Sequence, residues 1–216
     1  MKKLLTIATL FFLISCNDAP KQTVATTEAV TPEATTISSS SYTVDTAASS
    51  LQWEGYEGLS LGDAEHAGSL KISKGVVRTD SSIVTGGEFS FNMNSLAVTD
   101  IPATSPKNEK LKKHLLSADF FDAGKFPEAG FVVTGVTPKG ADSATVSGNL
   151  TLKGTEKNIS FPVAIQLTNS VIKAVSPIFY INRKDWGMHY RSENSLGDEM
   201  IRNELGIKIN IIAHKF

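Results

Sequence analysis

Alternation of large apolar and polar side chains constrains this 216-residue chain more than any other feature of its sequence. From Ile159 to Leu167 every odd position is apolar, and every even position is small or polar. Successive side chains of a β-strand point to opposite faces, so this period of two predicts strands that bury one face. The same pattern, clean or partial, predicts eight strands near Leu51–Glu57, Glu65–Ser73, Phe89–Met93, Phe131–Thr137, Leu150–Leu152, Ile159–Leu167, Val171–Ile181 and Ile207–Ile211.

Short polar or glycine-containing links join many of these runs, for example Lys153–Lys157 and Thr168–Ser170. Such links favour antiparallel hairpins between neighbouring strands. We expect an all-β fold, a closed eight-stranded antiparallel barrel, because closure removes the sheet edges that an open sheet leaves exposed. A two-sheet sandwich produces the same alternation, so periodicity alone leaves both architectures open.

The first fifteen residues form a separate segment. Two lysines follow Met1, and the run from Leu4 to Ile14 is almost wholly apolar. As a helix this run measures roughly 16 Å, against a hydrocarbon core of about 30 Å, so it is too short to span a membrane. Residues 1–15 are therefore predicted to be a signal peptide.

Cys16 is the only cysteine of the chain, which excludes an intramolecular disulfide and a Cys-x-x-Cys redox site. Its context, Leu13-Ile14-Ser15-Cys16, resembles the bacterial lipobox. That resemblance implies that diacylglycerol is attached to Cys16 and that cleavage makes this residue the new N-terminus. Two acyl chains are enough for stable membrane anchoring. A buried thiol or an ordinary cleavage site is the alternative.

The stretch from Asn17 to Ser41 is rich in Thr, Ser, Ala, Pro and Glu, with no aromatic residue. It offers too little apolar surface to offset the entropy of ordering, so residues 16–41 are predicted to be a lipidated cysteine followed by a flexible tether. The folded domain is expected to span residues 42–216. One short helix interrupts the strand pattern: Ser105-Pro106 suits an N-cap and first turn, and Leu111 and Leu115 follow at helical spacing.

The composition argues against several function classes. Lys and Arg number 21 and Asp and Glu 22, so no charge excess recruits nucleic acid. The four histidines are scattered, without a His-Glu-x-x-His pair, and no Gly-x-Ser-x-Gly motif is present. We therefore expect no catalytic residue, no metal and no resident cofactor. A homodimer is left open.

Several ordered motifs resemble the YceI-like family. The strongest runs from Leu111-Lys112-Lys113-His114-Leu115 through Asp119-Phe120-Phe121-Asp122 to Phe126-Pro127 and Phe131. Gly86-Gly87, Gly148-Asn149-Leu150-Thr151-Leu152-Lys153-Gly154 and Asn182-Arg183 with Asp185-Trp186-Gly187 agree in order and spacing. The resemblance covers residues 42–216. It implies a lipocalin-like barrel, exported to the cell envelope and facing the periplasm or cell surface, that holds an isoprenoid quinone or polyprenyl lipid.

The inward rows of the alternating strands are expected to share one barrel interior, which either encloses a ligand cavity or is filled as a packed core. A packed core would favour a non-enzymatic adhesion or assembly module instead of a lipid carrier. At the barrel mouth, Phe120, Phe121 and Trp186 either dock the helix or gate the interior, with Arg183 or a nearby lysine meeting a polar head group. The predicted interior residues are Phe89, Phe91, Phe131, Leu150, Leu152, Phe161, Val163, Phe179 and Ile209.

Overall fold

The computed structural model describes residues 23–32, 40–57, 66–80, 83–192 and 200–215. Within these ranges the chain forms eleven strands, one α-helix and one short 3₁₀-helix. In chain order they are β1 (Thr26–Glu28), β2 (Ser40–Val44), β3 (Ser50–Gly55), β4 (His66–Asp80), β5 (Ile83–Val98), α1 (Pro106–Leu116), β6 (Glu128–Pro138), β7 (Ser143–Leu152), β8 (Thr155–Leu167), β9 (Val171–Val175), β10 (Phe179–Asn182), η1 (Arg183–Trp186) and β11 (Glu204–Lys215).

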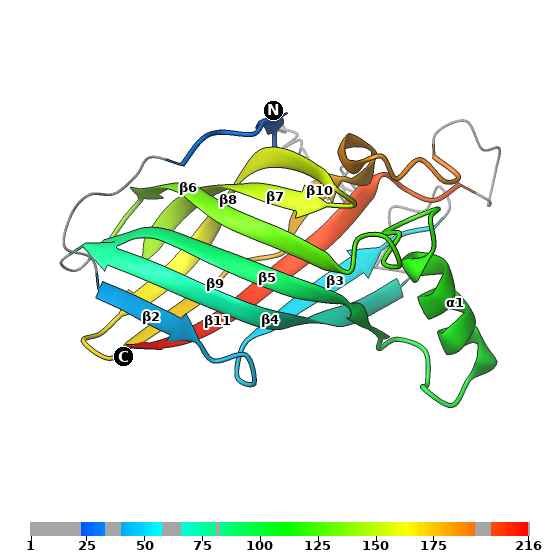
Figure 1. The fold of residues 1–216 in the computed structure, drawn as a ribbon, viewed down its shortest axis with the longest axis horizontal. Coiled ribbons are helices and arrows are strands. Elements are labelled where there is room, and N and C mark those ends of the chain that lie inside the picture. Colours follow the sequence, from blue (N-terminus) through cyan, green and yellow to red (C-terminus); the bar gives the residue numbers. More distant parts are fainter. Residues whose placement is uncertain (1–22, 33–39, 58–65, 81–82, 193–199, 216) are drawn as a thin grey trace, which may run out of the picture.

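Strands β2 to β11 close into an antiparallel ring (Figure 1). Strands β8, β7, β6, β5 and β4 pair in that order, and β4 then pairs with both β2 and β3. Both of these pair with β11, which pairs with β9, and β9 returns to β8. Because β2 with β3 and β9 with β10 each share one position beside β11, the ring has eight positions. The predicted eight-stranded barrel is confirmed, and the sandwich is excluded.

The two shared positions arise where the strands beside β11 are interrupted. Pro177 has no N–H to donate, and it separates β9 from β10 within the run that the alternation predicts as one strand. At each break a buried serine hydroxyl replaces a strand partner. Ile209 donates its N–H to Ser176 Oγ at 3.0 Å, and Ile212 donates to Ser49 Oγ at 2.9 Å. Strand β11 therefore stays bonded along its length.

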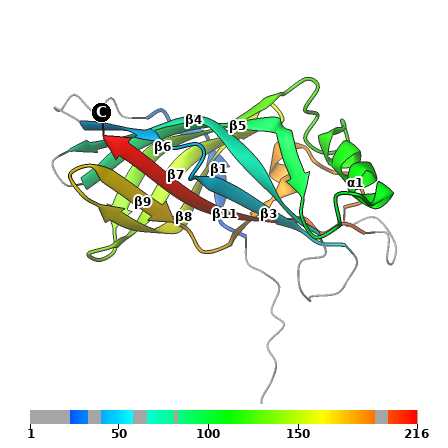
Figure 2. The same cartoon turned by 90° about the horizontal axis from the view of Figure 1, so that it is seen from below.

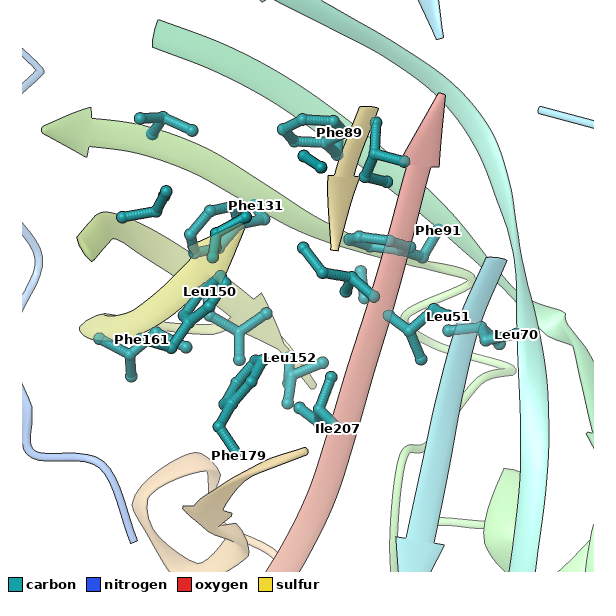
Figure 3. Close-up of a pocket in the computed structure, with 18 of the residues that line it drawn as sticks. Leu51, Leu70, Phe89, Phe91, Phe131, Leu150, Leu152, Phe161, Phe179 and Ile207 are labelled. Carbon is teal, nitrogen blue, oxygen red and sulfur yellow. The ribbon is translucent and has the colours of Figure 1, made fainter. Parts of the chain in front are cut away.

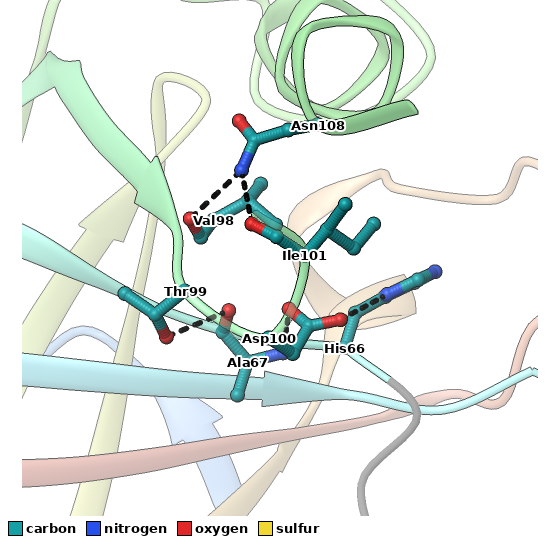
Figure 4. A network of polar contacts seen from close by, with 7 residues as sticks. All are labelled: His66, Ala67, Val98, Thr99, Asp100, Ile101 and Asn108. Atoms are coloured by element: carbon teal, nitrogen blue, oxygen red, sulfur yellow. Dashed lines mark hydrogen bonds and ion pairs between the residues drawn. The ribbon is translucent and has the colours of Figure 1, made fainter. Parts of the chain in front are cut away.

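Helix α1 lies at one end of the barrel (Figure 1) and begins as predicted. The side chain of Ser105 accepts a hydrogen bond from the Lys107 N–H, and proline opens the first turn. Asn108, which is buried, ties the helix to the end of β5 by donating to the carbonyls of Val98 and Ile101 at 3.1 and 2.7 Å (Figure 4). The helix is thus held over this end of the barrel, which we call the helix end.

A second contact network fixes the start of β4 beside the same loop (Figure 4). Asp100 accepts hydrogen bonds from the His66 ring at 2.8 Å and from the Ala67 N–H at 2.9 Å. Burial acts to raise the pKa of Asp100, but these hydrogen bonds outweigh it, so the pKa lies below its usual value. The carboxylate therefore stabilises the folded chain in its charged form.

The expected flexible tether is wrong over residues 23–32. Instead of leaving the barrel, this segment lies against it, and Thr26–Glu28 forms β1, paired with β8. The Thr and Glu side chains of β1 bury little apolar surface. The backbone of β1 instead pairs with β8, which lies more than a hundred residues away in the sequence. The predicted signal peptide and Cys16 lie outside the described residues. No helix among the described residues is long and apolar enough to cross a membrane.

Candidate ligand-binding cavity

The barrel encloses an elongated cavity, and the structure brings all nine predicted interior residues together around it. Figure 3 labels seven of the nine, whose side chains converge from separate strands on a common space: Phe89, Phe91, Phe131, Leu150, Leu152, Phe161 and Phe179. The cavity offers about 120 Å³ to the centre of a water-sized sphere, whereas one water needs only about 10–15 Å³ by that measure. The interior is therefore open, which overturns the packed-core alternative.

The lining is apolar over its whole length. Side chains missed by the sequence reasoning lie on the same inward rows, among them Leu51, Leu70, Met93, Ile207 and Ile211. The alternation of β3, β5 and β11 carries the signal for four of them, because Leu51, Met93, Ile207 and Ile211 each lie two positions from another lining residue on the same strand. Leu70 lies seven positions from Val77, the other described lining residue of β4, because the register of β4 shifts between them. Such a surface offers a ligand no hydrogen bond and suits a hydrocarbon chain.

Two glycines explain why large rings line the cavity without filling it. A Cβ added to Gly148 would overlap the ring of Phe131, and one added to Gly68 would overlap the indole of Trp53. Each ring therefore contacts backbone that only glycine leaves uncovered.

A stacked aromatic pair forms one side of the cavity wall. The rings of Phe161 on β8 and Phe179 on β10 lie 4.1 Å apart between centroids and 7° from parallel. Phe131 contacts the same pair through Phe161 at 5.5 Å. No pairing between β8 and β10 occurs among the described residues, so side chains hold this part of the wall together.

A smaller pocket of about 70 Å³, by the same measure, lies at the helix end. Trp53, Phe121 and Leu205 line both this pocket and the main cavity, and we call these three residues the neck. Phe120 and Arg183 also line the smaller pocket, together with His66, His114, Arg202 and Glu204. Polar groups therefore gather only on the outer side of the neck.

Arg183 does not have the role expected for a head-group partner. It is buried, and its guanidinium donates to the carbonyl oxygens of Arg202, Met188, Tyr190 and Ile201 at 2.5–3.0 Å. Burial lowers its pKa from the usual value, because the charged form loses hydration. The side chain holds two loops together, and this use of its donors corrects the expected head-group contact.

Trp186 is also not a gate. It is fully buried, lines neither pocket, and donates its Nε1–H to the Leu150 carbonyl at 3.0 Å. The Phe120 ring packs against the His114 and Tyr190 rings, at 5.0 and 5.7 Å between centroids. These positions favour the docking role for both side chains. Of the four predicted mouth residues, Phe121 alone lines both pockets.

Two further polar groups lie near the neck. The hydroxyl of Tyr56 donates to Glu54 at 2.8 Å and lies 3.5 Å from the Tyr180 hydroxyl. Burial, followed by these hydrogen bonds, raises the pKa of Tyr56, so the phenol stays protonated. Trp53 is buried as well, and its Nε1–H has no acceptor among the described residues. Trp186, by contrast, has its acceptor.

The family profile described as a YceI-like domain matches residues 42–213. The chain belongs to the YceI-like family. A UPF0312 protein of Shewanella denitrificans is 28% identical over 179 residues, covering 82% of each chain. A UPF0312 protein of Vibrio parahaemolyticus is 39% identical over 80 residues, which are 34% of this chain and 42% of the relative. That shorter match thus spans under half of the relative's length.

Solved structures share this YceI-like fold. BcnA of Burkholderia cenocepacia aligns with a TM-score of 0.63 at 20% identity, over 79% of this chain and 99% of BcnA. A polyisoprenoid binding domain from Saccharophagus degradans aligns with a TM-score of 0.56 at 13% identity, over 81% and 98% of the two chains. At these identities the likeness establishes the barrel architecture.

Proposed function

We propose that this chain is a bacterial envelope lipoprotein whose barrel binds the apolar chain of an isoprenoid lipid, either a quinone or a polyprenyl lipid, and that it binds without catalysis. The observation that carries the proposal is the elongated apolar cavity, open along the barrel interior. A cavity of this shape and chemistry matches a long hydrocarbon ligand better than a compact polar one.

Apolar burial supplies the affinity. Each Å² of ligand removed from water contributes about 25 cal/mol, from which the cost of association must be deducted. Among the described residues, the lining of the main cavity offers no hydrogen bond that would add to the binding free energy. A ligand therefore needs a long tail to bind well. The Saccharophagus degradans neighbour with the same fold, described as a polyisoprenoid binding domain, supports an isoprenoid tail.

The neck determines the orientation of the ligand. A carbonyl- or hydroxyl-bearing head is costly to bury without partners, and polar side chains lie on the outer side of the neck, in the pocket lined by Tyr56 and Glu204. Trp53, whose N–H has no acceptor among the described residues, lies at this boundary. The tail fills the barrel, and the head with its acceptor oxygen lies towards the helix end.

Binding is tested by titrating the protein with ubiquinone-2 and following the quenching of tryptophan fluorescence. Val163→Phe adds bulk to the cavity from strand β8, and Ala164→Phe places the same ring on the outer face of that strand. We expect only Val163→Phe to abolish quenching. Decylubiquinone carries the same head on an unbranched tail and shows whether the isoprenoid form is preferred. Equal quenching in both variants would reject the cavity as the binding site.

The membrane anchor rests on the lipobox-like context of Cys16. Because the acyl chain is attached through the thiol, Cys16→Ser should release the protein from the membrane fraction. Cell fractionation compares this variant with the wild type. An identical distribution of the two proteins would reject the lipoprotein assignment and leave lipid binding untouched.

A further inference from the structure

Strand β1 occupies a gap in the barrel wall. Strand β8 is joined to β9 only through its last four residues, Ala164–Leu167. Its earlier part meets β1 instead, where Thr26, Thr27 and Glu28 pair with Ile159, Asn158 and Lys157. On the other side, Val24 donates its N–H to the Tyr180 carbonyl of β10 at 2.7 Å. Residues 23–32, at the top of Figure 1 in blue, thus bridge β8 and β10.

The contacts that hold this segment are mostly polar and lie on the outside of the barrel. Asn149 is buried and uses both ends of its amide on one residue, accepting from the Val30 N–H at 3.0 Å and donating to the Val30 carbonyl at 2.8 Å. Lys157 pairs with Glu28 at 2.6 Å, but Glu28 is 88% exposed. Such exposed pairs stabilise weakly, by about 0–1 kcal/mol.

Residues 23–32 bury little apolar surface against the barrel. Val24 packs against the core, but Val30 is 47% exposed. Segments with few buried apolar contacts open at low free energy relative to the global unfolding of the same protein. The remaining wall strands, by contrast, contribute buried apolar side chains to the core. Residues 23–32 are therefore the part of the wall that opens most easily.

Directly inside this part of the wall lie the cavity and the stacked rings of Phe161 and Phe179. These rings hold β8 and β10 together by side-chain contact alone. When β1 leaves, β8 and β10 lose the backbone hydrogen bonds that join them through this segment. Ring pairs can rotate within a wall that has lost a strand, whereas a backbone ladder has to break.

We propose that residues 23–32 are a removable strand that closes a side portal between β8 and β10, through which the lipid enters and leaves the barrel. This inference rests on the proposed lipid-binding function. A long chain that slides in sideways avoids threading end-on past the neck at the helix end. Since Cys16 lies seven residues before Thr23, an anchor there keeps the segment within roughly 25 Å of the membrane, at about 3.3–3.6 Å per residue.

A disulfide across β1 and β8 tests the portal. Glu28 and Lys157 are direct partners in an antiparallel pair, whose Cα separation suits a disulfide. Glu28→Cys with Lys157→Cys is placed in the full chain carrying Cys16→Ser, so that no other thiol competes. The matched control is Gln166→Cys with Lys173→Cys, which staples the β8–β9 part of the same seam.

The readout is the rate of ubiquinone-2 uptake and release, followed by stopped-flow tryptophan quenching, with the amount bound at equilibrium measured alongside. We expect oxidation of the β1–β8 pair to slow both rates by roughly tenfold or more, as locking a lid does, and reduction to restore them. The control disulfide should leave both rates unchanged. Equal rates in oxidised and reduced β1–β8 protein would overturn the portal.

A complementary variant opens the segment without new thiols. Val24→Pro with Val30→Pro removes the two N–H donors that bond Tyr180 and Asn149. We expect faster exchange with an unchanged melting temperature of the barrel, and unchanged rates would argue against the portal. Absence of ubiquinone-2 binding in every form, the wild type included, would instead reject the proposed function itself, so the two failures are distinguishable.

Discussion

Phe131 in the barrel wall and Phe120 beside helix α1 are buried to the same degree, each 7% exposed. Their surroundings differ. Phe120 is enclosed by His114, Tyr190 and the Arg183 guanidinium, which lies 5.7 Å from its ring centroid. Phe131 lies close against Gly148 and lines the main cavity. Equal burial thus accompanies packing against two rings and a guanidinium at the helix end, and a place on the lining of the main cavity in the barrel.

The difference shows what keeps the interior open. At the helix end, the donors of Arg183 and Trp186 have acceptors, so these two side chains hold the surrounding backbone in place. In the barrel, glycines opposite the rings leave room that no side chain fills. The two regions should therefore respond differently to substitution, one in stability and the other in ligand binding.

The largest effect is expected at Arg183. Arg183→Met removes the donors of four carbonyl oxygens at once. Each buried polar group left without a partner costs about 1–3 kcal/mol, so we expect a loss of about 5 kcal/mol or more in the free energy of unfolding. Urea denaturation measures it. A loss below about 1 kcal/mol would show that these carbonyls find other partners.

Phe120→Ala and Phe131→Ala compare the two regions directly. Phe120→Ala should cost about 3–5 kcal/mol of stability, as truncation of an enclosed ring does, and leave lipid release unchanged. Phe131→Ala should cost less, because the ring already borders a void, and should alter ubiquinone-2 affinity. Thermal unfolding and fluorescence titration separate the two outcomes. Faster lipid release in Phe120→Ala would restore the gating role.

Gly148→Ala sharpens the argument about ring placement. The new methyl group overlaps the Phe131 ring and drives it off the wall, at an overpacking cost of about 1–3 kcal/mol. Because the ring moves towards the cavity, ligand affinity should fall. Gly135→Ala is the matched control, since nothing lies within 4 Å of a Cβ at that position. If both variants bind ubiquinone-2 equally, the glycine does not maintain the cavity.

The smallest effect is expected at Asp100, whose pKa is lowered in the folded chain. A lowered pKa means that this carboxylate contributes stability above its unfolded value, near ~3.9, and that the contribution is lost as pH falls through the folded pKa. Asp100→Asn should therefore destabilise the protein at neutral pH and converge with the wild type in acid. Melting curves from pH 7 down to about 2 measure this difference. A constant difference over that range would contradict the assignment.

Local patterns made part of this structure predictable. Alternation on single strands identified all nine interior residues, because every second side chain of a strand points to the same face. The Ser105-Pro106 start of α1 followed from capping chemistry. The run Val171–Ile181 was predicted as one strand, although Pro177 divides it.

Other features depend on contacts between distant residues. The composition of residues 23–32 is that of a tether, and its order comes from β8, β10 and Asn149, far along the chain. Arg183 looked available for a ligand, but its acceptors lie on loops that only the fold brings near. Whether the interior was open depended on rings that lie over Gly68 and Gly148, which the alternation does not encode.

The central claim is that an isoprenoid lipid lies inside the barrel. It is tested most directly by identifying the lipid that co-purifies with the protein. Wild-type protein purified from solubilised membranes is extracted with organic solvent, and the extract is analysed by mass spectrometry beside Val163→Phe and Ala164→Phe. The account predicts a stoichiometric isoprenoid lipid in the wild type and in Ala164→Phe, and its loss from Val163→Phe. Extracts without any isoprenoid, or with equal amounts from all three proteins, would contradict it.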